Sequence, residues 1–327
     1  MTCFMADDRI NHNSRKRIFA AISILVSAGL IAFLLARMDW PSVAQAIRTA
    51  NPAWLIAAAL CILIAPPLMT GRWRGVLRAQ EDDLSQLPFS VTLRAVLMAS
   101  VLNSFLPSKA GDLAKAAYLR KQSGLIRGLG TVVLERMVDF IVLGLLGLCG
   151  WALGGVIWGL VAGLLLLGGV GALFALIAWA PHGWLEFSPK LHGAAQDFRR
   201  VNRRWIARPL AVAQTFACSL GIWTMCGVIV FCLAHGFGQP LSPQLALSIF
   251  PLAVLAGLMP ATISGYGTRD AAFVALLASH APREESTLIA LGYSAIAYWL
   301  LALIGLPVVF AEIRAFLRKA KDTSNAE

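Results

Sequence analysis

The chain has 327 residues, of which 58% are hydrophobic and only 14% are charged, and its mean hydropathy is +0.71. Soluble domains carry about 25% charged residues, so this composition excludes a soluble globular protein and predicts a membrane protein with several spans. The net charge of +11 lies in short basic clusters between apolar runs. Because no aromatic-rich soluble domain accompanies them, we expect no nucleic-acid partner.

Eight apolar runs follow one another along the chain, at 18–36, 53–70, 89–106, 131–149, 151–180, 209–235, 243–260 and 286–311. A helix needs about 20 such residues to cross a bilayer. The first run follows three basic residues and lacks an A-x-A cleavage site, so it predicts an uncleaved span rather than a signal peptide. The six cysteines form no C-x-x-C pair, and we expect no disulfide framework, metal site or cofactor.

The stretch 102–121, LNSFLPSKAGDLAKAAYLRK, breaks the third apolar run with proline, glycine and charges. If 89–119 is a re-entrant hairpin that enters and leaves on the cytoplasmic side, then 22 of the 28 Lys and Arg residues lie on that side. If 89–106 crosses fully, the basic clusters at 109–127 and 181–208 both lie outside. The positive-inside rule favours the hairpin.

A second break, LMPATISGYGTRDAAF at 258–273, interrupts the segment 243–281, which we expect to enter from the opposite side. Paired segments interrupted by glycine or proline point to the binding site of an inverted-repeat transporter. The sequence therefore predicts an all-α polytopic bundle with six full spans and two re-entrant broken hairpins in an inverted-topology repeat. We expect one integral membrane domain, 1–327, with these parts: a cytoplasmic tail 1–17, a first half-repeat 53–149, a cytoplasmic amphipathic loop 181–208, a second half-repeat 209–311 and a cytoplasmic tail 312–327.

Three motifs carry a resemblance to a known family: NSFLPSKAGDLAKAAYLR, TVVLERMVDF and MPATISGYGTRDAAF. In this order they resemble the lysylphosphatidylglycerol synthase transmembrane-region family, also called flippase-like proteins. The resemblance implies a membrane-embedded lipid translocation unit, without the soluble aminoacyl-transfer domain of the synthase members. The chain departs from the family at Lys109, where arginine is common, at Ser264, where glycine is common, and at Asp270, where glutamate is usual. A lysine cannot form the bidentate contact that an arginine makes.

Charged residues within the apolar segments are the candidate site, because ionisable groups in a bilayer are costly and face a partner or a wet cavity. Glu135 and Asp139 lie four residues apart on one helix face, with Arg136 beside them. We predict that Arg136 and Arg269 face one cavity and hold a lipid phosphate; the alternative is that they only neutralise neighbouring carboxylates. The candidate substrate-binding residues are Asn103, Pro107, Lys109, Gly111, Asp112, Glu135, Arg136, Asp139, Pro260, Gly265, Gly267, Arg269 and Asp270.

Other features predict packing and membrane contact rather than chemistry. A ridge of glycines at every fourth position indicates close helix packing, within the chain or in a homodimer: Gly155, Gly159 and Gly163. Two groups are expected to be interfacial anchors: Arg72-Trp73-Arg74 and Trp40. The loop 181–208 is expected either to rest on anionic lipid or to be solvated.

Three functions fit these patterns. The favoured one is a non-enzymatic translocator of an anionic phospholipid or a polyprenyl-linked glycolipid in the inner or plasma membrane, with both termini cytoplasmic. The alternative is a non-catalytic accessory subunit that partners enzymes of cell-envelope lipid or glycan synthesis. A membrane transferase is less favoured, because no DxxD or Ser/His/Asp grouping stands out on a predicted cytoplasmic face.

Overall fold

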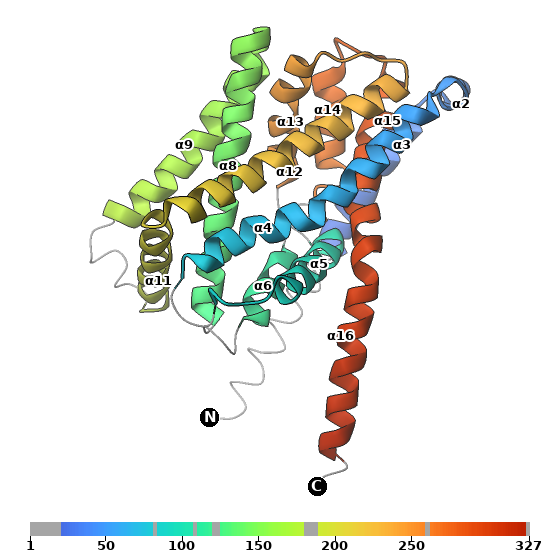
Figure 1. Ribbon diagram of the computed structural model, residues 1–327. Helices are drawn as coiled ribbons and strands as arrows, with labels where there is room; N and C mark the ends of the chain where they lie inside the picture. The colour runs from blue at the N-terminus through green and yellow to red at the C-terminus, as the bar shows by residue number, and fades with distance from the viewer. Residues whose placement is uncertain are drawn as a thin grey trace, which may run out of the picture.

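Helices form nearly all of the structure (Figure 1). The computed structural model describes residues 21–80, 84–106, 110–119, 125–179, 189–258 and 262–324, and these residues contain no extended strand. The all-α prediction is confirmed. In chain order the elements are the helix Ala21–Ala36, α2 (Trp40–Thr49), α3 (Pro52–Cys61), η1 (Ile62–Ile64), α4 (Ala65–Arg78), α5 (Phe89–Phe105), η2 (Ala110–Asp112), α6 (Leu113–Tyr118), α8 (Leu125–Gly154), α9 (Ile157–Trp179), α11 (Pro189–Ile206), α12 (Pro209–Gly236), α13 (Pro243–Gly257), α14 (Thr268–Leu277), α15 (Arg283–Ser294), η3 (Ala295–Leu300) and α16 (Leu301–Ser324).

Several helices are long and apolar enough to span a membrane. Four meet this condition within the described residues: Pro52–Arg78, Ile157–Leu176, Pro209–Gly236 and Arg283–Ala315. Ala21–Ala36 and α2, joined at a bend of 86°, count as a fifth if they are taken as one span. The predicted span 131–149 lies inside α8, whose 30 residues reach about 45 Å. The predicted span 18–36 begins outside the described residues.

Both predicted breaks are present, and each separates helices too short to cross a bilayer alone. The α5 helix has 17 residues and α6 has 6, whereas α13 has 15 and α14 has 10. The α5 helix ends because Leu106 is extended, as is typical of a residue before proline. In Figure 1, α5 and α6 lie toward the lower end of the bundle and α13 and α14 toward the upper end. This is the arrangement expected of hairpins that enter from opposite sides; the inverted repeat itself stays a prediction.

The predicted glycine ridge packs within the chain, but it is not one continuous helix face. A Cβ on Gly163 would lie 2.5 Å from Leu148, and one on Gly147 would lie 2.9 Å from the carbonyl oxygen of Gly159, so α9 packs closely on α8. Gly155 instead lies in the turn between these helices, with φ +68°, and is not part of a helix. A homodimer through these glycines stays a prediction.

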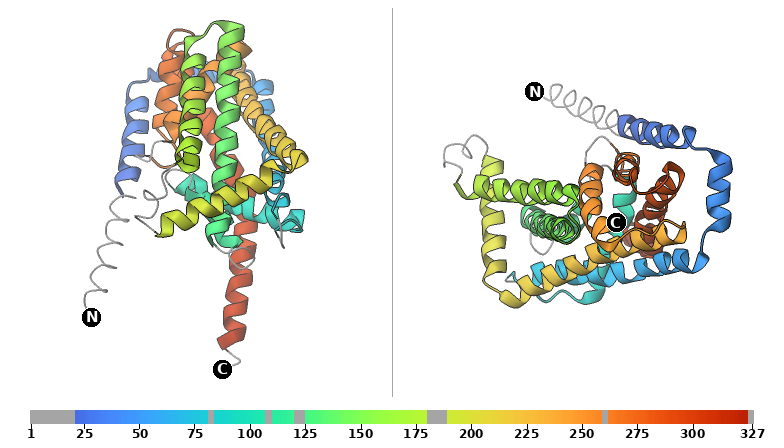
Figure 2. Two further views of the ribbon diagram at one scale, coloured as in Figure 1. Left: turned by 90° about the vertical axis from the view of Figure 1, so that its left-hand side faces the viewer. Right: turned by 90° about the horizontal axis from the view of Figure 1, so that it is seen from above.

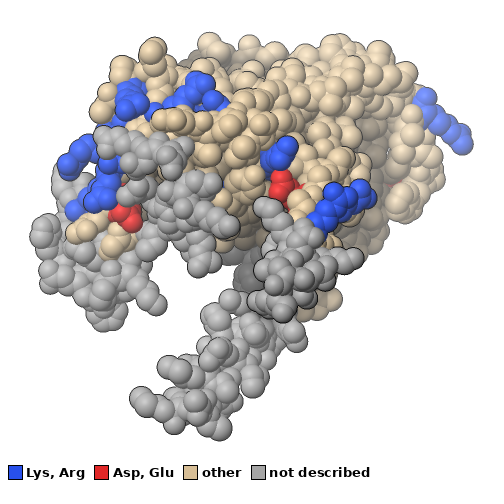
Figure 3. All heavy atoms as spheres, turned by 60° about the horizontal axis from the view of Figure 1, so that its bottom comes forward, with Lys and Arg blue, Asp and Glu red and all other residues tan. Residues whose placement is uncertain are grey.

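The α11 helix is amphipathic and packs on the protein. Its buried residues Phe198, Val201 and Trp205 point inward, and Val201 lies beside Gly130 of α8. Figure 2 shows α11 crossing the end of the bundle near α8. Arginines such as Arg200 and Arg203 remain exposed. On this end of the molecule, which Figure 3 brings forward, blue Lys and Arg outweigh red Asp and Glu among the coloured side chains.

Candidate functional site

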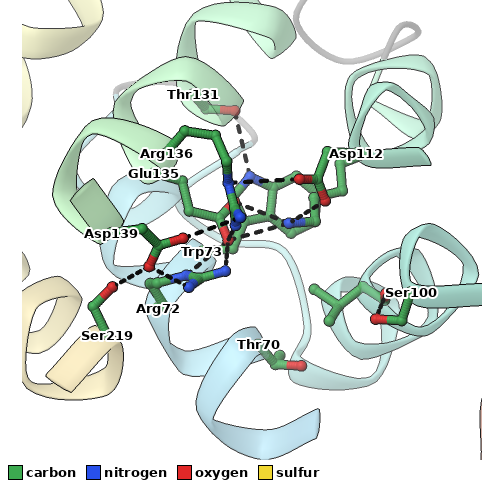
Figure 4. Close-up of polar contacts among 12 residues, drawn as sticks. Thr70, Arg72, Trp73, Ser100, Asp112, Thr131, Glu135, Arg136, Asp139 and Ser219 are labelled. Carbon is green, nitrogen blue, oxygen red and sulfur yellow. Dashed lines mark hydrogen bonds and ion pairs between the residues drawn. The ribbon is translucent and has the colours of Figure 1, made fainter. Parts of the chain in front are cut away.

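The first charged cluster joins α4, the short arm η2–α6 and α8 (Figure 4). The α4 helix contributes Arg72, the short arm η2–α6 contributes two charges, and α8 contributes three within about one turn. Its members are Arg72, Asp112, Lys115, Glu135, Arg136 and Asp139.

Arg72 bridges two carboxylates of α8. Its Nε donates to Oε1 of Glu135 at 2.8 Å, and its guanidinium donates to Oδ1 of Asp139 at 2.5 Å. The side chain is 2% exposed. The prediction that Arg72 and Trp73 are interfacial anchors is therefore wrong: Trp73 is also fully buried, and its Nε1 donates to Oγ1 of Thr131 at 3.3 Å. The cause is that α4 packs between α12, α5 and α8, which removes this face from both lipid and water.

Lys115 and Arg136 complete the cluster and differ in exposure. Nζ of Lys115 lies 3.0 Å from Oε2 of Glu135 and 3.3 Å from Oδ1 of Asp112, and it is fully buried. Arg136 lies 3.1 Å from Asp139, 3.2 Å from Glu135 and 3.5 Å from Asp112, yet its side chain is 21% exposed. Among the described cations of this cluster, Arg136 is thus the one that is partly exposed.

Polar side chains of neighbouring helices hold the carboxylates in place. Ser219 of α12 donates to Oδ1 of Asp139, and Nε1 of Trp223 donates to the same oxygen at 2.9 Å. Nδ2 of Asn103 donates to Oδ1 of Asp112 at 3.1 Å. The close approach depends on Gly111, where a Cβ would lie 2.7 Å from the carbonyl oxygen of Ala99.

A second charged site lies at the other broken hairpin. Arg269 donates to the carbonyl oxygen of Ser264 at 3.2 Å and to Oγ of Ser294 at 2.6 Å, and lies 3.7 Å from Oδ1 of Asp270. Its guanidinium also lies over three aromatic rings, those of Tyr266, Tyr293 and Tyr298, at 5.8, 5.4 and 4.3 Å. With 1% of its side chain exposed, Arg269 is enclosed.

The turn before α14 requires glycine. Gly265 and Gly267 have φ of +77° and +87°, and a Cβ on Gly265 would lie 2.6 Å from Cα of Gly257. Asp270 then caps the start of α14, because its Oδ2 accepts from the backbone N–H of Gly267 at 3.0 Å. These residues shape the hairpin and fix the direction of Arg269.

The two hairpins meet at their breaks. Ser264 of the second donates through Oγ to the carbonyl oxygen of Asn103, the residue of the first that holds Asp112. A cavity of about 80 Å³ lies beside this contact. Partners of the first charged cluster, Asn103 and Trp223, line it together with Tyr293 and Tyr298, which surround Arg269.

The structure thus gathers most of the predicted residues into two linked sites. Pro107, Lys109 and Pro260 lie outside the described residues. Within the described part of the chain, no group of His, Cys, Asp or Glu could hold a metal ion. The sequence interpretation missed eight contributors: Arg72, Lys115, Ser219, Trp223, Tyr266, Tyr293, Ser294 and Tyr298. Of these residues, only Lys115 could have been predicted from the sequence, because it lies three residues after Asp112, a spacing at which opposite charges pair on a helix.

Comparison with known proteins identifies the family. The model of the lysylphosphatidylglycerol synthase TM region matches residues 20–305. The chain belongs to this family. It is also similar to a UPF0104 membrane protein of Methanothermobacter thermautotrophicus, with 23% identity over 283 residues, covering 76% of this chain and 82% of the relative. Together with the long apolar helices, this family membership makes it a multi-pass membrane protein.

Proposed function

We propose that this protein moves a phospholipid or a polyprenyl-linked glycolipid between the leaflets of the inner or plasma membrane, with both termini cytoplasmic. One observation carries the proposal: two broken hairpins meet beside a partly polar cavity that is lined by partners of both buried charged sites. Non-helical backbone at membrane depth is tolerated where it is buried in protein or lines a wet cavity. Such breaks in paired positions are typical of transporter binding sites.

The two arginines take different parts in this proposal. Arg136 contacts the lipid phosphate, because it is partly exposed and its planar fork matches phosphate oxygens. Arg269 stabilises the second hairpin, because it bonds the carbonyl oxygen of Ser264 and lies over the rings of Tyr266, Tyr293 and Tyr298. An accessory subunit, the alternative, would gain nothing from a partly exposed arginine within a buried ion-pair cluster.

The test is transport by purified protein in liposomes that carry a fluorescent anionic phospholipid or a polyprenyl-linked sugar. The accessible fraction of the probe in each leaflet is followed over time. Arg136→Lys should slow movement about tenfold or more, because one charge-assisted hydrogen bond to the phosphate is lost. Arg269→Lys should instead lower the melting temperature, since a single ammonium cannot reach both Ser264 and Ser294.

Arg94→Lys serves as the matched control, because Arg94 is exposed and pairs only loosely with Glu312, at 3.5 Å. Full activity in Arg136→Lys would show that Arg136 does not form a bidentate contact with the lipid phosphate. If wild-type protein moves neither probe faster than protein-free liposomes do, translocation of these lipids is refuted and the accessory function is favoured.

A further inference from the structure

We infer that the groove between the helix Ala21–Ala36 and α14 binds one membrane phospholipid, with its phosphate at Arg283 and an acyl chain along α14. The site lies toward the upper end of Figure 1, where α15 contacts both α14 and α2. The short arm η2–α6 of the first charged cluster lies toward the lower end. The inference does not rest on the proposed translocation, because a lipid bound in this groove need not move between leaflets.

Small side chains on α14 open the groove. Ala271, Ala275 and Ala278 are spaced four and three residues apart, so they share one face. Phe33 and Leu34 line the groove from the helix Ala21–Ala36, and its volume is about 430 Å³. Ligand pockets have volumes of about 300–1,000 Å³. From Ala271 to Ala278 the groove follows α14 for about 10 Å, roughly a third of the hydrocarbon core of a bilayer, so it suits part of one acyl chain.

Arg283 is the charged residue in the lining of this groove. Its side chain is partly buried, and its Nε is buried without a hydrogen-bond partner among the described residues. The carboxylates nearby in sequence are directed elsewhere. Glu284 accepts from the backbone N–H of Asp39 at 3.3 Å, and the carboxylate of Asp39 caps α2 by accepting from Ser42. Glu285 lies two positions after Arg283, so the two side chains do not share a face of α15.

A buried donor without an acceptor is costly, and an arginine matches phosphate oxygens with parallel N–H groups. A second cation lies close by, because the guanidinium of Arg37 is 4.8 Å from the ring centre of Phe33 in the groove wall. A phosphate at Arg283 would therefore supply the acceptor that Nε lacks and would also be attracted by Arg37.

The position of Arg283 also fits a lipid headgroup. Arg283 is the first residue of the candidate span Arg283–Ala315, so it lies at one end of a membrane-spanning helix. Trp40 lies at the same level, since it follows Asp39, which bonds to Glu284. Trp40 is 59% exposed, and tryptophan is enriched at the level of the headgroups. The groove thus has its cation where a phosphate lies and its apolar wall where a chain lies.

Another groove of the molecule lacks this combination. It lies between α12 and α13, has a volume of about 280 Å³ and has no charged residue in its lining, which includes Gly227 and Phe231. Such a groove can contact lipid chains, but it offers no group that distinguishes a phospholipid from a lipid without phosphate. It therefore provides the matched comparison.

Native mass spectrometry of the full chain in detergent tests the inference, because it counts bound lipids and gives a Kd from a titration. Three probes share the same two chains: dioleoyl phosphatidylglycerol, dioleoyl phosphatidylethanolamine and dioleoylglycerol, which has no phosphate. Glycerol 3-phosphate, which has no chains, is the fourth probe.

Wild-type protein should bind both phospholipids in this groove, and it should bind dioleoylglycerol and glycerol 3-phosphate about tenfold more weakly or less, because each lacks one of the two contacts. Arg283→Gln should raise the Kd for both phospholipids about tenfold, since a charge-assisted hydrogen bond is lost. Ala278→Phe should do the same by filling the groove; Ala278 is exposed, so the larger side chain leaves the core intact.

Two variants are matched controls and should keep the affinity of the wild type. Arg48→Gln removes an exposed arginine of α2, and Gly227→Phe fills the groove between α12 and α13, where an added Cβ meets no atom within 4 Å. Arg136→Lys should retain the bound lipid that Arg283→Gln loses, which separates this groove from the site of the proposed translocation.

Equal binding of dioleoylglycerol and the two phospholipids by wild type would overturn the inference whether or not any variant folds. Binding of glycerol 3-phosphate as tight as that of the phospholipids would overturn the lipid as the ligand. Unchanged phospholipid binding in Arg283→Gln or in Ala278→Phe would overturn the assignment to this groove. A wild-type dimer that Ala278→Phe dissociates would assign the groove to a second copy of the chain. Phospholipid binding at Arg283 without lipid movement in liposomes would support this inference and refute only the proposed translocation.

Discussion

Replacing Arg72 by methionine should destabilise the protein strongly, because it removes the ion pairs between α4 and α8. Arg72 is 2% exposed and joins Glu135 and Asp139 through contacts of 2.8 and 2.5 Å. Breaking a buried ion pair by removing one partner costs about 3–5 kcal/mol. At roughly 2–4 °C per kcal/mol for a chain of this order of size, the melting temperature should fall on the order of 10 °C. Arg72→Lys keeps the charge but cannot span both carboxylates, so about half of that loss is expected.

The measurement is thermal unfolding in detergent, followed by intrinsic tryptophan fluorescence. The matched control is Arg94→Met, because the pair with Glu312 is largely solvent-accessible and contributes about 0–1 kcal/mol. A melting temperature of Arg72→Met equal to that of Arg94→Met would refute the buried bridge. That result would instead favour the earlier prediction that Arg72 is an interfacial anchor.

Two further predictions concern topology and the second hairpin. In a cysteine-free background, a cysteine at Ala194 on α11 should resist an impermeant thiol reagent in intact cells, whereas one at Arg48 on α2 should react; labelling of Ala194→Cys from outside would contradict the cytoplasmic placement of α11. Gly265→Ala should abolish lipid movement while the protein still inserts, because φ of +77° and Gly257 at 2.6 Å leave no room for a Cβ. At Gly193 an added Cβ would have no atom within 4 Å, so Gly193→Ala should leave lipid movement unchanged. A fully active Gly265→Ala variant would show that the glycine turn is not required for lipid movement.

The sequence predicted the elements whose signals are local. Proline and glycine marked both breaks, and the spacing of Glu135 and Asp139 placed them on one face of a long helix. The role of Arg72 could not be read in this way. An Arg-Trp-Arg group at the end of an apolar run is typical of an interfacial anchor, and only the packing of α4 against α8 shows that two of its side chains are buried. Gly155 was misplaced for a similar reason, because a four-residue glycine spacing does not reveal where one helix ends and the next begins.

The ion pairs of the first cluster also bear on how the proposed translocator would release its lipid. A pocket with excess positive charge would bind an anionic headgroup tightly and would retain it, since little else in a bilayer competes for the charge. Here a built-in competitor is present, because the Asp112 carboxylate lies 3.5 Å from the Arg136 guanidinium. Lys115 meanwhile joins α6 to Glu135 of α8 at 3.0 Å, so release of a lipid from Arg136 would not require the hairpin to detach. Weak binding in the empty state and a preserved scaffold are both conditions for repeated loading and release. In the proposed function, the ion pairs of Arg136 with Asp112, Glu135 and Asp139 meet the first condition, and the pair of Lys115 with Glu135 meets the second.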